Sequence, residues 1–147
     1  MKSNASVLRQ LFLYALSAAV SINAVQAEML SPKNSYLKYK SALSSASKIE
    51  DLCSFYCKQV NDEIKQTPPE MKPMLFSLMK ETSPQLVTIT SEDVSGDSAK
   101  LALVSSATEA NKSPNVSETT TGTVTFLKED GEWKIKKETW SSKIESK

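Results

Sequence analysis

The segment GTVTFLKEDGEWKIKK, residues 122–137, has the pattern of a β-hairpin. Apolar residues alternate with polar ones on both sides of a central turn: Val124 and Phe126 before it, Trp133 and Ile135 after it. The turn is Asp130-Gly131, a pair that readily adopts the positive φ angles of a two-residue hairpin turn. The segment therefore predicts two antiparallel strands that share one apolar face.

Trp140 departs from this alternation by one residue. A period of two that starts at Trp133 places odd-numbered residues on the apolar face, and residue 140 is even. One extra residue in a strand produces such a shift, so we predict a β-bulge near Lys137.

Two further segments upstream alternate in the same way, on either side of a Gly96-Asp97 turn. They are residues 85–94, with Val87 and Ile89, and residues 99–106, with Leu101 and Leu103. Residues 107–117 are rich in Ser, Asn, Lys and Pro and are typical of a loop. The second half of the chain thus predicts an antiparallel meander of about four strands, with threonine and lysine on its wetter face.

The chain before Pro84 has a helical period instead. Ser31-Pro32 is a favourable helix start, and Ser47 with Glu50 has the spacing of a capping box. The expected apolar positions of three helices are Tyr36, Tyr39, Leu43 and Ala46; then Ile49, Leu52, Cys53, Tyr56, Val60 and Ile64; then Met71, Met74, Leu75, Leu78 and Met79.

Helices followed by strands are typical of an α+β domain whose helices cover one face of a sheet. We therefore predict about three N-terminal helices packed on an antiparallel sheet of about four strands. The expected core residues are Leu43, Ile49, Tyr56, Val60, Leu75, Leu78, Val87, Ile89, Leu101, Val124, Phe126, Trp133 and Ile135.

Residues 1–27 have the layout of a secretory signal peptide. Lys2 and Arg9 provide a positive start, an apolar stretch follows at residues 11–22, and small residues precede Glu28. The stretch is well short of the roughly 20 residues that span a bilayer. We expect cleavage before Glu28, which leaves a single domain at residues 28–147, periplasmic or secreted and without a membrane anchor.

The composition excludes several kinds of site. The chain has no histidine, and Arg9, inside the expected signal peptide, is its only arginine. Cleavage would leave 16 basic and 17 acidic side chains. Nucleic-acid binding depends on clustered positive charge, so this balance argues against it. No motif indicates a cofactor, a metal or a catalytic residue.

Four segments together resemble the nuclear transport factor 2-like superfamily, which includes ketosteroid isomerases and SnoaL-like proteins. They are YLKYKSAL at residues 36–43, VSGDSAKL at 94–101, GTVTFLK at 122–128 and EDGEWKI at 129–135. In order, they resemble that family's first helix, its turn into a strand, a strand entering a hairpin, and its terminal hairpin. The resemblance spans nearly all of residues 28–147, and its motifs are structural rather than catalytic.

The resemblance implies a cone-shaped α+β fold, in which the helices and a curved sheet enclose a pocket. Enzymes of the superfamily place an aspartate, histidine or tyrosine inside the cone. This chain has no histidine to match, and no acidic residue corresponds to a family catalytic position. It is most similar to exported bacterial members, so the resemblance implies no catalytic residue.

Cys53 and Cys57 are the only cysteines and stand four residues apart on the second expected helix. Their spacing does not match the two-residue gap of a dithiol redox motif. The chain has several methionines, but no histidine or third cysteine supports a copper(I) site. Two interpretations stay open: a disulfide, favoured by an oxidising compartment, and a pair of buried thiols.

Tyr56, Phe126 and Trp133 are the candidate pocket-lining residues, although aromatic residues on the inner face of a sheet commonly serve as core. The resulting hypothesis is an exported, non-catalytic domain that binds a small apolar ligand in a cone-shaped pocket. Two alternatives stay open: a module that contacts another protein of the cell envelope, and an isomerase- or dehydratase-like enzyme. The sequence also leaves a homodimer open.

Overall fold

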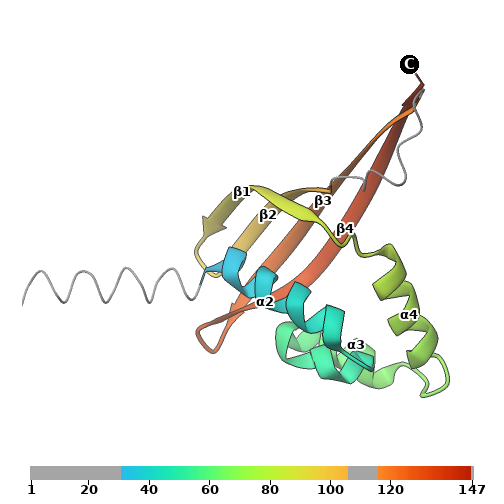
Figure 1. The fold of residues 1–147 in the computed structure, drawn as a ribbon. Helices are drawn as coiled ribbons and strands as arrows, with labels where there is room; N and C mark the ends of the chain where they lie inside the picture. The colour runs from blue at the N-terminus through green and yellow to red at the C-terminus, as the bar shows by residue number, and fades with distance from the viewer. Residues whose placement is uncertain (1–30, 106–115, 147) are drawn as a thin grey trace, which may run out of the picture. The chain divides into compact units, whose positions relative to one another are not determined.

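The computed structural model describes residues 31–105 and 116–146 (Figure 1). The expected signal peptide at residues 1–27 and most of the expected loop at residues 107–117 lie outside the described residues.

Helical elements form the first half of the described chain, and strands form the second. The helical elements are α2 (Pro32–Ser45), the 3₁₀-helix η1 (Ile49–Phe55), α3 (Lys58–Gln66) and α4 (Lys72–Thr82). The strands are β1 (Val87–Ser95), β2 (Ser98–Ser105), β3 (Val116–Glu129) and β4 (Glu132–Ser146). The strands form one antiparallel sheet in the order β1-β2-β3-β4. The α+β class and the four-stranded antiparallel sheet are therefore confirmed.

The β3–β4 hairpin has the predicted turn and the predicted bulge. Asp130 and Gly131 both have positive φ, 51° and 82°. Thr125 pairs with Lys137, whereas the next residue of β3, Phe126, pairs with Ile135, so Lys136 is the extra residue. Because of this bulge, even-numbered residues of β4 beyond it lie on the same face as odd-numbered residues before it.

The helices cover one face of the sheet, which we call the inner face. α2 contacts β1, β2 and β4, and its Tyr36 side chain is fully buried (Figure 1). The buried residues of the helical half are Tyr36, Tyr39, Leu43, Ile49, Leu52, Tyr56, Cys57, Ile64 and Phe76. Those of the sheet are Ala99, Leu101, Leu103, Val124, Phe126, Trp133 and Ile135.

Most of the expected core residues are buried or half-buried. Val60, Leu75, Val87 and Ile89 are half-buried and pack against the core. Leu78 is 54 % exposed, so its assignment to the core was wrong. The expectation missed several buried residues, notably Tyr36, Leu52, Phe76 and Leu103.

The error at Leu78 comes from the rotation of α4 about its own axis. The face toward the core carries Phe76, which is buried, and the half-buried Leu75 and Met79. Met74 and Leu78 lie on the opposite side of the expected stripe and are 65 % and 54 % exposed. Successive helix positions differ by about 100°, so a modest rotation exchanges one apolar stripe for its neighbour.

The second expected helix is also wrong, because it is interrupted at Tyr56 and Cys57. Tyr56 has extended backbone angles and forms an isolated parallel bridge with Ile135 of β4. The Cys57 N–H donates to the carbonyl of Ile135 at 3.0 Å. The chain thus leaves the helical path to bind the sheet, and η1 and α3 are separate elements.

The expected capping box of Ser47 and Glu50 is not the one that forms. The carboxylate of Asp51 accepts the backbone N–H groups of Ser47 and Lys48 at 3.0 and 3.2 Å. Glu50 instead forms an ion pair with Lys72 at the start of α4, at 3.1 Å. Asp51 therefore stabilises the start of η1 by satisfying donors that the helix leaves free.

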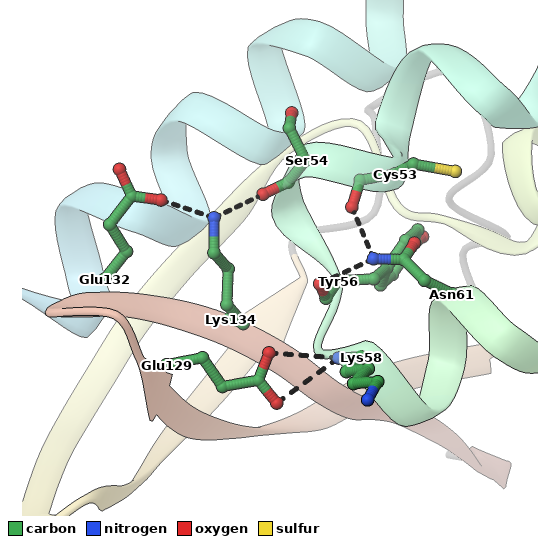
Figure 2. A network of polar contacts seen from close by, with 8 residues as sticks. All are labelled: Cys53, Ser54, Tyr56, Lys58, Asn61, Glu129, Glu132 and Lys134. Carbon is green, nitrogen blue, oxygen red and sulfur yellow. Dashed lines mark hydrogen bonds and ion pairs between the residues drawn. The ribbon is translucent and has the colours of Figure 1, made fainter.

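Polar contacts join the η1–α3 break to the β-hairpin (Figure 2). Asn61 Nδ2 donates to the carbonyls of Cys53 and Tyr56 at 2.9 and 3.0 Å. Lys134 on β4 donates to the carbonyl of Ser54 at 2.7 Å and also to Glu132. These contacts give hydrogen bonds to carbonyls at the end of η1, where the interrupted helix supplies few helical donors; the Cys53 carbonyl also accepts the Tyr56 N–H.

Glu129, at the end of β3, caps α3 from the neighbouring element. Both of its carboxylate oxygens accept the backbone N–H of Lys58, at 3.0 and 3.2 Å (Figure 2). The negative charge also lies at the positive end of the helix dipole. The contact therefore ties the start of α3 to the hairpin.

We expect Glu129→Ala to lower the free energy of unfolding by about 1 kcal/mol, because it removes a helix cap. Urea denaturation followed by circular dichroism measures the change. Glu132→Ala is the matched control, since Glu132 is exposed and its carboxylate accepts from Lys134 of the same strand rather than from a helix N–H. An equal or larger loss in the control would show that Glu129 does not act as a cap.

The sheet continues beyond β1 and β2 as a two-stranded ribbon (Figure 1). Among the described residues, β2 pairs with β3 only as far as Thr120, which lies opposite Ser105. Residues 116–119 of β3 pair with residues 143–146 of β4.

Candidate functional site

A cleft of about 440 Å³ lies between the inner face of β4 and the helices α3 and α4. Its walls are largely apolar, and the apolar residues that line it are Ile49, Val60, Ile64, Leu75, Met79, Ile135 and Trp140. Its polar lining includes the hydroxyl-bearing Tyr39 and Tyr56, two carboxylates and two ammonium groups; the charged residues are Glu63, Glu138, Lys136 and Lys137. An apolar cleft with a few polar groups is the usual composition of a small-molecule site.

Glu138 is the central polar residue of this cleft. It pairs with Val124 across the β3–β4 ladder, so the bulge turns its half-buried side chain to the inner face. Its Oε1 accepts the Tyr36 hydroxyl at 2.9 Å and the Trp140 indole N–H at 2.8 Å. Within the described part of the chain, its Oε2 has no hydrogen-bond partner, and no lysine forms an ion pair with it.

Trp140 holds its position by packing on a glycine. Trp140 pairs with Gly122, and a Cβ placed on Gly122 would lie 2.6 Å from two carbons of the indole ring. Only a residue without a side chain allows the ring to approach the strand this closely. The glycine therefore permits the ring orientation from which the indole N–H reaches Glu138.

Two further tyrosine hydroxyls lie in the cleft. The hydroxyls of Tyr39 and Tyr56 are 3.0 Å apart and hydrogen-bonded, and their rings meet edge to face. Burial raises the pKa of Tyr56 to about 12 and raises the pKa of Tyr39 further. Burial, followed by the charge of Glu138, also raises the pKa of Tyr36. All three tyrosines are therefore neutral at physiological pH and act as hydrogen-bonding groups rather than as bases.

Lys40 on α2 lies near enough to Glu138 for the two charges to interact. Burial lowers the pKa of the Lys40 ammonium, and the negative charge of Glu138 opposes that shift. The ammonium itself donates to the hydroxyl of Ser83 and to the carbonyl of Pro84. Lys40 therefore fastens α2 to the end of α4, and it makes no direct ion pair with the Glu138 carboxylate.

The three candidate pocket residues lie in different places. Tyr56 lines the cleft. Phe126 is 1 % exposed and packs in the core, and Trp133 is buried near the hairpin turn, with the Lys128 ammonium 5.4 Å from the centre of its ring. Neither Phe126 nor Trp133 lines this cleft.

The cysteines do not lie on one helix as expected. Cys53 is in η1 and half-buried, whereas Cys57 is buried and precedes α3. Both are free thiols in the structure. No group of three metal-ligating side chains gathers anywhere in residues 31–105 and 116–146.

Glu138, Trp140 and Tyr39 also line the cleft, and none of them was among the candidate pocket residues. A signal for two of them was present: Trp140 is out of step, and a bulge before it implies that residue 138 also faces inward. The tyrosines carry no such signal, because a tyrosine on an apolar helix face is compatible with either core or pocket.

The described helices are each too short or too polar to cross a membrane. No protein-family model matches the chain, and neither the curated proteins nor the solved structures contain a significant match to it.

Proposed function

We propose that this chain is an exported, non-catalytic domain that binds a small, mostly apolar ligand in the cleft between β4 and the helices α3 and α4. The size and lining of the cleft are the observations that support this proposal. Its volume of about 440 Å³ falls in the range of roughly 300–1,000 Å³ that is usual for ligand sites. Its walls are largely apolar, and its polar groups include Glu138, whose carboxylate is oriented by the Trp140 indole N–H and can in turn orient a ligand.

We further propose that the domain is a nuclear transport factor 2-like cone, with its N-terminal helices packed on a curved sheet. The order of elements, helical first and then a four-stranded antiparallel meander, supports this proposal. A cleft between the helices and the inner face of the sheet is where such a cone would hold its ligand.

Binding is favoured over catalysis by the state of the polar groups. The tyrosines have raised pKa values and do not supply a base near neutral pH. Lys40 is engaged with Ser83 and Pro84, and one oxygen of Glu138 is held by two neutral donors. For the enzyme alternative, Glu138 therefore offers a single carboxylate oxygen for proton transfer, and the other carboxylate of the cleft, Glu63, is exposed to solvent.

A thermal-shift screen with aromatic compounds and short-chain lipids tests the proposed function. A ligand present at about 100 times its dissociation constant adds about 2.7 kcal/mol to the free energy of unfolding. Val60→Trp places a large side chain in the cleft and is expected to abolish the shift. Leu78→Trp, on the exposed side of α4, should keep it.

If no compound stabilises the protein, and pull-down from envelope extract returns one stoichiometric partner, the ligand proposal is wrong. The alternative of a protein-contact module then replaces it.

A further inference from the structure

Glu138 is a half-buried anion whose bound partners are neutral. Its Oε1 is held by a tyrosine hydroxyl and an indole N–H, at 2.9 and 2.8 Å. These donors fix the orientation of the carboxylate but carry no positive charge of their own. A carboxylate withdrawn from water is stabilised most by a cation that donates a hydrogen bond to it.

We infer that the ligand is an organic cation, a protonated amine on an apolar body, and that its ammonium donates to Glu138 Oε2. The inference rests on the proposed function and adds the chemical class of the ligand. Tyr36 and Trp140 are positioning residues, since they occupy one carboxylate oxygen and leave the other for the ligand.

The aromatic lining of the cleft fits this ligand. Tyr39, Tyr56 and Trp140 all line the cleft that Glu138 lines. Aromatic rings attract cations through their negative faces, and they pack equally well against an apolar body. A cluster of a carboxylate and aromatic rings therefore recognises both parts of an amphipathic amine.

The lysines near the cleft do not occupy this position. Lys40 donates to Ser83 and to Pro84, and it makes no ion pair with Glu138. Lys136 and Lys137 line the cleft, but both side chains are exposed, and they also border a second hollow together with Lys100. Solvent screens exposed charges, so they weaken the attraction of Glu138 for a cation only modestly.

An anionic ligand is disfavoured. A carboxylate ligand at this position would place a second negative charge beside Glu138, and like charges in a partly buried site repel. A neutral alcohol can donate to Oε2 but forms a weaker bond than an ammonium. The order expected for ligands of one size and shape is therefore amine, then alcohol, then carboxylate.

Calorimetric titration with three matched compounds tests this order: 2-phenylethylamine, 2-phenylethanol and 3-phenylpropionate, at neutral pH. We expect the amine to bind about tenfold more tightly than the alcohol. Glu138→Gln retains an oxygen that can accept from Tyr36 and Trp140, and it should remove this tenfold preference. Glu81→Gln is the control, because Glu81 is exposed on α4 and does not line the cleft; its amine affinity should change by less than about twofold. Glu63→Gln tests the second carboxylate that lines the cleft.

The outcomes separate the two proposals. If the alcohol binds the unmodified protein as tightly as the amine does, or Glu138→Gln keeps the preference, the amine inference is overturned and ligand binding stands. If Glu63→Gln removes the preference instead, the carboxylate has been misassigned. If the amine, the alcohol and the thermal-shift panel all fail to bind, both the amine inference and the proposed function are wrong.

Discussion

Phe126→Ala is expected to lower the free energy of unfolding by about 3–5 kcal/mol, the usual cost of removing a buried aromatic side chain. Phe126 is 1 % exposed and pairs across the sheet with Ala99 on one side and Ile135 on the other. Its removal leaves a cavity at the centre of the inner face. The free energy of unfolding of a domain is only about 5–15 kcal/mol, so this single change removes a large part of it. Urea denaturation of the purified domain measures it.

A matched pair of leucines provides the control for this prediction. Leu101 is fully buried on β2, whereas Leu78 is exposed on α4. We expect Leu101→Ala to cost about 2–5 kcal/mol and Leu78→Ala to change stability by less than about 0.5 kcal/mol. Similar losses in both variants would mean that α4 presents its other face to the core.

Gly122→Ala is expected to cost about 1–3 kcal/mol, although it adds only one methyl group. The new Cβ would lie 2.6 Å from carbons Cε3 and Cζ3 of Trp140, so the ring must move. That movement breaks the 2.8 Å bond from the indole N–H to Glu138. The loss should therefore appear in stability and in amine binding together.

A double-mutant cycle isolates the contact between Gly122 and Trp140. In a Trp140→Ala background, Gly122→Ala should cost much less, with a coupling energy of about 0.5–3 kcal/mol. If the loss is the same in both backgrounds, the clash lies elsewhere. Denaturation in urea gives all four free energies of unfolding.

The strand half was predictable because its signals are local. The Asp130-Gly131 turn sets the hairpin, and the alternation around it sets which residues face the core. The position of Trp140, one residue out of step with the alternation, also predicted the bulge. These features depend on neighbours within a few residues, and period-two patterns leave little choice of register when one face is buried.

The helical half was less predictable because its errors involve contacts distant in sequence. The apolar positions from Ile49 to Ile64 continue at helical spacing through the break, and the break exists because Tyr56 binds Ile135 of β4. The rotation of α4 is likewise set by its contact with η1. Two apolar stripes on α4 share Leu75 and Met79, so periodicity alone does not choose between them.

The candidate site depends on both kinds of signal. The inward position of Glu138 follows from the bulge, because residue 138 lies between the bulge and Trp140, two positions before Trp140 and on the same face of β4. Its partner Tyr36 lies 102 positions away in the sequence, on α2. No local pattern brings these two residues together, because their contact requires the packing of α2 on the sheet.

The ribbon at the far end of β3 and β4 gives the domain an uneven local stability. Two strands on their own are marginally stable in water, whereas the same strands are secured where β2 and the helices pack on them. Local opening therefore begins at residues 116–119 and 143–146, which pair with one another. Glu138 and Trp140 lie opposite Val124 and Gly122, in the part of β3 that also pairs with β2. The end of the β3–β4 ribbon away from the turn can thus open and close many times while the cleft keeps its shape.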